Sequence, residues 1–331
     1  MESFREQLLI LISTPVYIII IACEIILSNV QHRKTYTVRD TITNIYLLIA
    51  NSSIELLFRA LYVGVLVYFF NRHFYIIHTP VIYWILLLVL EDFLYYWLHR
   101  FDHEIRLFWA VHVTHHSSEQ MNFAVGFRSS VFQPLYRFIY FIPLALLGFK
   151  PIDIVFIYSV TQIWGIFVHT ELINKMGWLE YIFVTPSHHR VHHASNPKYL
   201  DRNMGMFLII WDKIFGTFQP ELDVSQYSQI KYGLTTPLQT ANPATVIFHE
   251  WSMITKDIAR KDISLKQKLG YVFGPPGWSH DGSRMTSEEM REKEALFVSG
   301  VFSEKQNPLE VTIKDSVSSD NTGNKVGNAF R

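Results

Sequence analysis

The feature that most constrains the fold of this chain is a series of apolar segments long enough to cross a lipid bilayer. A spanning helix needs about 20 predominantly apolar residues, and residues 8–28, which read LLILISTPVYIIIIACEIILS, have that length. A second apolar segment covers residues 44–70, and a third begins at Pro80. Because a segment in lipid must satisfy its backbone hydrogen bonds internally, these stretches predict membrane-crossing α-helices.

A fourth apolar region, residues 134–168, is too long for one span and is interrupted by the sequence GFKP at 148–151. Glycine and proline together favour a tight turn, so we expect two apolar helices arranged as a hairpin. No segment after about residue 178 is apolar enough to span. The predicted fold class is therefore all-α, with about four or five spans including the hairpin and a histidine-rich helical cap.

The predicted domain organisation is simple. Residues 1–302 are expected to form a single integral-membrane domain. From residue 303 to residue 331 the chain is polar and has few large apolar residues. Such a composition cannot bury enough apolar surface to offset the entropy of ordering the chain, so this stretch is predicted to be a disordered tail.

Composition and charge narrow the class of partner. Charged residues make up 18% of the chain, and the 29 lysines and arginines equal the 29 aspartates and glutamates. Binding to nucleic acid would need a basic surface, so no nucleic acid is expected as a partner. The single cysteine, Cys23, lies in the first apolar segment and excludes both an intramolecular disulfide and a cysteine-based zinc finger.

The basic residues of the linkers predict an orientation. The linker at 29–43 carries three lysines or arginines, whereas the linker at 71–79 carries one. Because cytoplasmic loops are enriched in these residues, the first linker is expected to face the cytoplasm, and counting spans places residues 99–133 on the same side. We therefore predict a multi-pass protein with its site facing the cytoplasm, in the inner membrane of a bacterium or the endoplasmic reticulum of a eukaryote.

Three groups of histidines have the spacing of one helix face. They read HRFDH at 99–103, HVTHH at 112–116 and HRVHH at 189–193. Residues three and four apart share a face of an α-helix, and a neutral imidazole is the commonest metal ligand. Eight donors exceed the four of one structural zinc site, so they suit two metal ions in one site. The eight are His99, His103, His112, His115, His116, His189, His192 and His193.

The other histidines divide into one further candidate and a remainder. His169 lies at the end of the predicted hairpin, on the side of the three groups, and we interpret it as a ninth ligand. His188 points about 100° away from His189 on a helix, so it is expected to support the ligands rather than to bind metal. The scattered histidines are interpreted as surface or interfacial residues: His32, His73, His78, His249 and His280.

The same residues allow three other interpretations of the histidines to be weighed: a polar helix face, a zinc protease and a metal transporter. One pair four residues apart is often only a polar helix face, but three groups after an apolar segment favour metal binding. A zincin needs H-E-x-x-H, and the two His-Glu sequences, HEIRL and HEWSM, lack the second histidine. A metal transporter would hold its ligands within the spans, whereas these groups follow them. A non-enzymatic metal-binding or transport protein therefore remains only a remote alternative.

Ligating histidines usually donate their second ring N–H to an acceptor that fixes the ring. Glu104 directly follows His103 and is the carboxylate that we expect to serve catalysis in this way. For every nearby carboxylate the plainer alternative is solvated charge at the membrane surface, which we expect for Asp102. The six candidates are Glu91, Asp92, Asp102, Glu104, Glu119 and Glu171.

The order and spacing of the three groups resemble the fatty acid hydroxylase (sterol desaturase) superfamily of membrane di-iron enzymes. Its pattern is H-x(3–4)-H, then H-x-x-H-H, then a distant second H-x-x-H-H, and all three histidine boxes fit it. Within the superfamily, residues 80–280 are similar to the alkylglycerol monooxygenase branch. The similar sequences are EDFLYYWLHRFDHE, WAVHVTHHSSE, HTELINKMGWLE, TPSHHRVHH, LIIWDKIFGTF, YGLTTPL and GPPGW.

This resemblance implies a chemistry. It implies two iron ions held by the nine histidines, with O₂, a lipid substrate and an electron donor of unknown identity as partners. One oxygen atom would enter a lipid C–H bond; in an ether lipid, attack beside the ether oxygen would release an aldehyde and a glycerol derivative. Tetrahydrobiopterin as reductant is carried by resemblance alone, since animal members use it. The alternative is a sterol, fatty-acid or carotenoid hydroxylase or desaturase.

Overall fold

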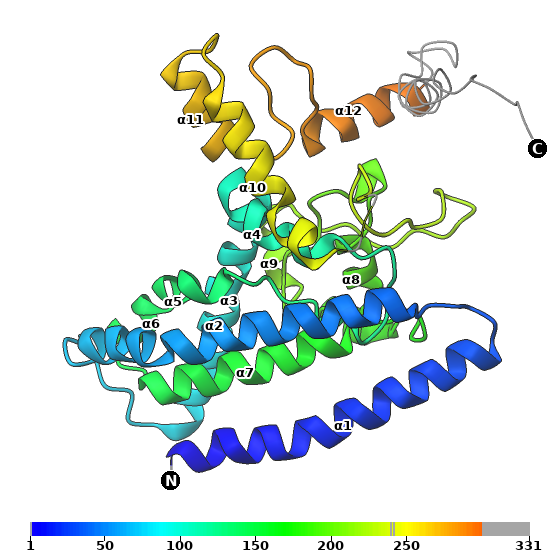
Figure 1. Cartoon of the computed structure of the whole chain (residues 1–331). Helices are drawn as coiled ribbons and strands as arrows, with labels where there is room; N and C mark the ends of the chain where they lie inside the picture. The colour runs from blue at the N-terminus through cyan, green and yellow to red at the C-terminus, as the bar shows by residue number, and fades with distance from the viewer. Residues whose placement is uncertain (1, 239, 241, 300–331) are drawn as a thin grey trace, which may run out of the picture.

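The structure is a computed structural model that describes residues 2–238, 240 and 242–299. Within these residues the architecture is all-helical, as predicted, and the only extended pairings are two isolated bridges. Figure 1 shows long helices lying side by side in the lower part of the molecule and shorter helices above them. The polar tail predicted for residues 303–331 lies outside the described residues.

Three helices are long and apolar enough to cross a membrane. They are α1 (Glu2–Val30), α2 (Val38–Phe70) and α3 (Pro80–Glu104), and their most apolar windows have mean hydropathies of 2.2, 1.7 and 1.7. Helix α2 begins where the Thr37 hydroxyl accepts a hydrogen bond from the backbone N–H of Asp40, a common way for a helix to start. The three predicted long spans are therefore present.

The predicted hairpin differs from two full helices. Its first arm is broken into short pieces: a 3₁₀ turn η2 (Gln133–Leu135), α5 (Arg137–Tyr140) and α6 (Ile142–Leu146). Its second arm is one helix, α7 (Pro151–Phe167). Prolines stand in the first turns of η2 and α6, and a proline ring clashes with the carbonyl of the preceding turn, so no long helix can run through this stretch. The four or five expected spans are thus three long helices and a hairpin of shorter apolar ones.

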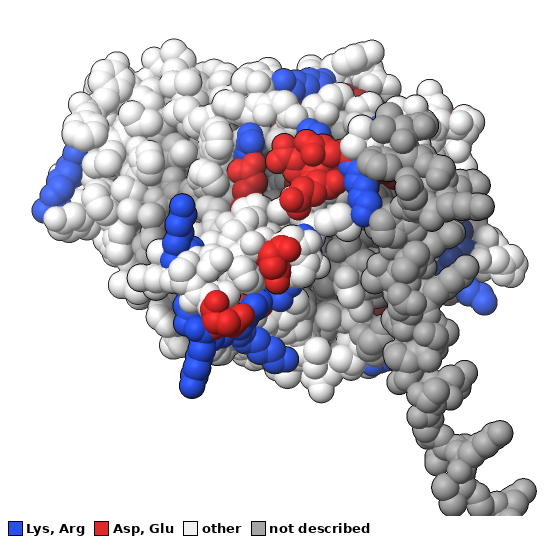
Figure 2. Space-filling model, turned by 90° about the horizontal axis from the view of Figure 1, so that it is seen from above, with Lys and Arg blue, Asp and Glu red and all other residues white. Residues whose placement is uncertain are grey.

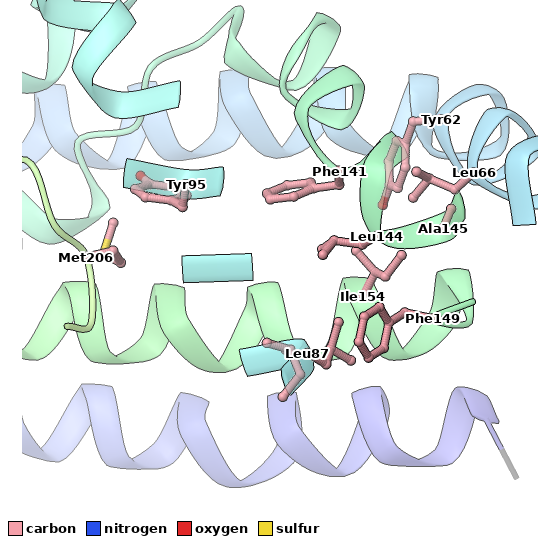
Figure 3. Packing of buried hydrophobic residues seen from close by; sticks show 11 residues of the cluster. Tyr62, Leu66, Leu87, Tyr95, Phe141, Leu144, Ala145, Phe149, Ile154 and Met206 are labelled. Carbon is pink, nitrogen blue, oxygen red and sulfur yellow. The ribbon is translucent and has the colours of Figure 1, made fainter. Parts of the chain in front are cut away.

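The central apolar cluster joins α2, α3, α6 and α7. Figure 3 shows Tyr62 and Leu66 of α2 beside Leu144 and Ala145 of α6, with Ile154 of α7 and then Leu87 of α3 below them. Between lipid-embedded helices, close van der Waals packing replaces water exclusion as the main attraction. This cluster therefore fixes how the third span crosses its neighbours, and with it the position of the span's last turns.

The linkers at 29–43 and 71–79 lie at opposite ends of the helix bundle. At one end, the Arg33 guanidinium donates to the backbone oxygen of Glu171 at 3.2 Å, next to the chain leaving α7. At the other end, the Phe74 N–H donates to the Leu146 oxygen at 2.9 Å. The basic linker at 29–43 thus lies at the histidine end of the bundle, which is the arrangement that the span count predicted.

Short helices form the cap. Those nearest the bundle are α4 (Arg106–His116), α8 (Pro186–His192) and α9 (Ile210–Phe215), with 3₁₀ turns η1 (Val125–Phe127), η3 (Gly177–Tyr181) and η4 (Pro197–Tyr199). Beyond them lie α10 (Pro243–Ala259), α11 (Leu265–Phe273) and α12 (Ser287–Val298) (Figure 1). Seen from above, this face intersperses basic and acidic side chains (Figure 2).

The buried Arg106 ties the outer helices to the end of the third span. Its guanidinium donates to Glu250 at 2.6 Å and to Asp257 at 2.7 Å, both on α10, and to the backbone oxygen of Tyr271 on α11 at 3.2 Å. A buried guanidinium is stable only with such carboxylate partners. The cap is therefore anchored where the chain leaves α3.

Candidate metal centre

The structure brings the nine predicted histidines together as two adjoining groups. Within each group, one ring nitrogen from every member lies within 4.8 Å of the others. Eight of the nine are buried, and His115 is half-buried. The first group is His99, His103, His112, His116 and His192, and the second is His115, His169, His189 and His193.

The H-x-x-H-H spacing explains how two helices serve both groups. On α4, the pair four apart, His112 and His116, enters the first group, while His115 is turned about 100° from His116 and enters the second. On helix α8 the assignment is reversed. The pair four apart, His189 and the C-cap residue His193, enters the second group, and His192 enters the first. The rings of His116 and His193 stack at 4.4 Å between centroids, which joins the groups.

Backbone carbonyls fix the tautomer of four rings. A carbonyl oxygen can only accept, so the Nδ1 that it faces must carry the hydrogen, and the Nε2 of a neutral ring then carries a lone pair. The four contacts are His99 to Met204 at 2.8 Å, His115 to Arg128 at 2.9 Å, His169 to Gly165 at 2.6 Å and His192 to Arg202 at 3.0 Å.

Lone pairs therefore face one another where no hydrogen lies between them. The Nε2 atoms of His115 and His169 are 3.3 Å apart, although both rings donate from Nδ1 to carbonyls. The Nε2 atoms of His103 and His192 are buried, and among the described residues they have no hydrogen-bond partner. A buried acceptor without a partner is costly, and a cation would satisfy all four atoms. The residues present thus fit a bound metal.

Burial keeps the site histidines in the form that binds metal. Desolvation lowers the pKa of His115 to about 4. Desolvation first, and the charge of neighbouring imidazoles second, hold the pKa well below its usual range for His112, His116, His169, His189, His192 and His193. At neutral pH these rings are therefore uncharged, as a metal ligand must be.

Two carboxylates approach ligand rings. The Asp201 side chain lies 3.1 Å from His103 Nδ1, and Asp102 lies 3.9 Å from His112 Nδ1. Asp102 is held in place by the Tyr136 hydroxyl, which donates to it at 2.6 Å. Such carboxylates fix ring orientation and raise donor strength, so these two occupy the position that the sequence analysis expected for Glu104.

Glu104 itself lies away from the nine histidines. Its carboxylate accepts from Arg100 Nε at 2.7 Å, and its side chain is 44% exposed. Adjacent helix residues point about 100° apart, so following His103 directly turns Glu104 outward rather than toward the site. Its position supports the plainer alternative of a surface ion pair.

The interpretation of nearby carboxylates as solvated charge is wrong for three of them. Glu91, Asp92 and Asp102 are fully buried. Asp92 binds the segment that follows the third histidine box, accepting from Phe207 N at 2.9 Å, Leu208 N at 3.0 Å and Trp211 Nε1 at 2.9 Å. A carboxylate with three donors can be buried at tolerable cost, and it positions that segment against α3.

The segment DRNMG at 201–205 supplies three contacts that the sequence analysis missed. It provides the Asp201 carboxylate and the backbone oxygens of Arg202 and Met204. Asp201 and Asn203 have φ values of 51° and 56°, a conformation that Asp and Asn adopt more readily than most residues. The sequence signal that could have indicated these contacts is the cluster of Asp, Asn and Gly soon after the third histidine box.

Two other histidines have structural contacts of their own. His188 belongs to neither group; its side chain completes the N-terminal cap of α8 with Thr185, and its ring lies 5.6 Å from that of Phe218. His280, interpreted from the sequence as a surface or interfacial residue, bonds the Tyr271 hydroxyl through Nδ1 at 2.8 Å.

Comparisons with known proteins agree with this geometry. The fatty acid hydroxylase family model matches residues 84–217, which include all nine histidines. An alkylglycerol monooxygenase of Xenopus tropicalis is 33% identical over 276 residues, covering 82% of this chain and 60% of that protein. The human alkylglycerol monooxygenase is 42% identical over 204 residues, covering 61% of this chain and 44% of that protein.

A bacterial relative widens the comparison. An ornithine lipid hydroxylase of Rhizobium tropici is 32% identical over 151 residues, covering 45% of this chain and 46% of that protein. The chain spans at most 60% of the length of these relatives. No solved structure matches it. Residues 84–217, which carry all nine histidines, therefore match the fatty acid hydroxylase family, and the chain also has three helices long and apolar enough to cross a membrane.

Proposed function

We propose that this protein is a membrane oxygenase that uses two iron ions and O₂ to hydroxylate a C–H bond of a lipid, and that its substrate is an alkylglycerol-type ether lipid. The observation that carries the proposal is the pair of adjoining groups with five and four histidines. Imidazole donors suit iron among other metals, and the family and its relatives favour iron and a lipid.

The ligand assignment follows from the two groups. The first group of five and the second group of four would each hold one ion, since each exceeds or equals the donors of one tetrahedral site. When bound, the iron pair supplies the redox chemistry that makes O₂ able to attack a C–H bond. The protein supplies the ring orientations, through the carbonyl contacts, and a site that excludes water.

The reaction that we propose balances with two electrons from a donor. One atom of O₂ enters the C–H bond beside the ether oxygen, and the other leaves as water after taking up two electrons and two protons. The resulting hemiacetal breaks its carbon–oxygen bond to give an aldehyde and a free glycerol hydroxyl. Tetrahydrobiopterin is a proposed donor, supported by the similarity to the alkylglycerol monooxygenases alone.

Aromatic side chains border the first group on two sides. The Tyr95 ring lies 5.8 Å from that of His99, and the Trp109 ring lies 5.2 Å from that of His103. Apolar walls of this kind exclude water and allow an alkyl chain to approach. We propose that the lipid enters between these walls from the membrane and that the cap faces the cytoplasm, as the basic linker at 29–43 favours.

The test is oxygen transfer from labelled O₂. Purified iron-loaded protein in detergent is given a monoalkylglycerol, ¹⁸O₂ and either tetrahydrobiopterin or a chemical reductant. The aldehyde is reduced in place to its alcohol, so that its oxygen cannot exchange with water. The expected product carries one ¹⁸O and appears with an equal amount of glycerol. An unlabelled product, or no product with either donor, would contradict the proposal.

The enzyme-level alternative is hydroxylation of another lipid, and the similarity to an ornithine lipid hydroxylase favours it. Sterols, fatty acids and an amino-acid-linked lipid are therefore incubated in parallel and examined by mass spectrometry. A hydroxylated product from one of these, with the alkylglycerol unchanged, would replace the ether-lipid assignment and keep the oxygenase. Tight metal binding without turnover of any lipid would favour a metal-binding protein.

A further inference from the structure

Two cavities of about 230 Å³ each lie in the described part of the molecule without a role in the chemistry so far. The first opens among α2, α5 and α7. The second lies where α2 begins and α4 ends, against α10. Their positions relative to the nine histidines decide which of them can serve the reaction.

The first cavity is separated from the histidines by two aromatic rings. Tyr158 lines it, and the ring of Tyr158 lies 6.2 Å from that of Tyr95, which in turn lies 5.8 Å from that of His99. A lipid group bound there would lie well away from the first histidine group. A headgroup that is only a few bonds from the reacting carbon could therefore not bind in the first cavity while that carbon lies at the histidines.

The second cavity is linked to the histidines through its lining residues, although none of the nine histidines lines it. Its lining includes Ser117, which follows His116 in the chain, and Arg128. The backbone oxygen of Arg128 accepts from His115 Nδ1 at 2.9 Å, and its guanidinium donates to Ser117 Oγ at 2.9 Å. The same residue thus forms part of the cavity wall and orients a ring of the second group.

The charges around the second cavity are balanced and differ in exposure. Arg128 is 2% exposed, and its guanidinium is neutralised by Asp40 at 3.0 Å. At the rim, Arg39 and Glu119 are exposed and present one cationic donor and one anionic acceptor. Since Thr37 and Asp40 belong to the start of the apolar helix α2, the rim lies at the depth where lipid headgroups meet a span.

We propose that the second cavity binds the uncharged, hydroxyl-bearing head of the lipid substrate. The inference rests on the proposed function, because the carbon beside the ether oxygen is only a few bonds from the glycerol hydroxyls. Those hydroxyls accept from Arg39 and donate to Glu119. A phosphate or carboxylate head would bring its negative charge against the carboxylate of Glu119, while the Arg128 guanidinium is already neutralised by Asp40, so the site favours a neutral polyol over an anionic head.

The experiment measures equilibrium binding rather than turnover. Metal-loaded protein in detergent, without O₂ or reductant, is titrated with a monoalkylglycerol, with the chain-matched fatty alcohol and with the phosphorylated alkylglycerol. The rim variants are Arg39→Gln and Glu119→Gln. The matched controls are Arg260→Gln and Asp262→Asn, which change an exposed ion pair of 2.7 Å in the loop after α10.

Each rim variant is expected to weaken monoalkylglycerol binding about tenfold, the effect of losing a hydrogen bond to a charged group. Binding of the fatty alcohol is expected to change much less, and both controls and the metal content are expected to match the wild-type protein. Wild-type affinity in both rim variants, an equal loss with the fatty alcohol, or tighter binding of the phosphorylated lipid would each overturn the assignment.

This design separates the inference from the proposed function. Selective monoalkylglycerol binding that depends on Arg39 and Glu119, without any oxidation once O₂ and reductant are added, would refute the proposed reaction and leave the headgroup site standing. If the rim variants instead bind the monoalkylglycerol as tightly as the wild-type protein and oxidise it as rapidly, the result would support the proposed reaction and refute the headgroup site.

Discussion

His115 and His192 each contribute to a different histidine group, which makes them a direct test at the scale of single residues. His115→Ala removes a donor from the second group, and His192→Ala removes one from the first. We expect each variant to lose about one of two metal ions and to fall at least about 100-fold in turnover, beyond the effect typical of losing a supporting contact. Elemental analysis and turnover of the same preparation check this.

His280→Ala is the matched control for these two variants. His280 lies outside both groups and bonds the Tyr271 hydroxyl, so metal content and turnover are expected to equal those of the wild-type protein. Full metal content with normal turnover in His115→Ala or His192→Ala would remove that residue from the ligand set.

The carboxylates near the site give a second contrast between residues. Asp201→Asn weakens the contact with His103 Nδ1, which is 3.1 Å long, and is expected to cost about 10–100-fold in metal affinity or activity. Glu104→Gln changes only the surface pair with Arg100, and such exposed pairs contribute about 0–1 kcal/mol. We therefore expect near wild-type metal content and turnover for Glu104→Gln.

The measurement compares both variants side by side, with circular dichroism to confirm folding. A loss in Glu104→Gln as large as that in Asp201→Asn would show that Glu104 reaches the site during turnover. Equal activity of the two variants at the wild-type level would show instead that neither carboxylate supports a ligand.

At the scale of elements, the turn before α7 depends on one glycine. Gly148 has a φ of +92°, and a Cβ at this position would lie 2.0 Å from the backbone oxygen of Tyr75. Gly148→Ala is therefore both strained and in collision with the loop between α2 and α3. We expect a loss of stability on the order of 1–3 kcal/mol or more, seen as a lower midpoint in a thermal scan of the detergent-solubilised protein.

Gly64→Ala is the control for the turn. Gly64 lies within α2, and a Cβ there meets nothing within 4 Å. Alanine is favoured over glycine inside a helix by about 1 kcal/mol, so the midpoint is expected to stay unchanged or to rise slightly. Similar midpoints for Gly148→Ala and the wild-type protein would show that the turn has an alternative conformation.

At the scale of the whole molecule, metal ions bound by the nine histidines would also hold the fold together. These histidines come from α3, α4, α8 with its C-cap, and the chain after α7, and a ligand that binds only the folded state stabilises it. We expect two metal ions per chain and a clear decrease of the thermal midpoint after chelation. A stoichiometry near one at full activity would contradict the assignment of one ion to each group.

The metal-free protein should lose stability in acid. An unfolded histidine has a pKa of about 6.5, whereas burial holds the pKa of His115 at about 4 and that of His112 and His189 well below the usual value. Between these limits the unfolded chain binds more protons, so stability decreases as the pH falls from about 6.5 toward about 4. Thermal midpoints of chelated protein measured across this window check the sign, and a constant or rising midpoint would refute it.

The amino-acid sequence by itself determined the features that depend on local periodicity. Three apolar helices follow from the length of the predominantly apolar segments, and the turn at 148–151 follows from glycine and proline. The nine histidines follow from spacings of three and four on a helix face and, for His169, from the place where the hairpin ends. Such patterns act within one or two helical turns, so they can be interpreted before any packing is known.

Only the tertiary structure decided what depends on the meeting of distant segments. The division of the histidines into five and four requires the crossing of α4 and α8 beside the end of α3. The contact between His103 and Asp201 joins residues 98 positions apart, whereas Glu104, one position away, is turned outward by the helix itself. Direction and long-range proximity are properties of the packed chain, because packing alone brings side chains from separate helices to one point.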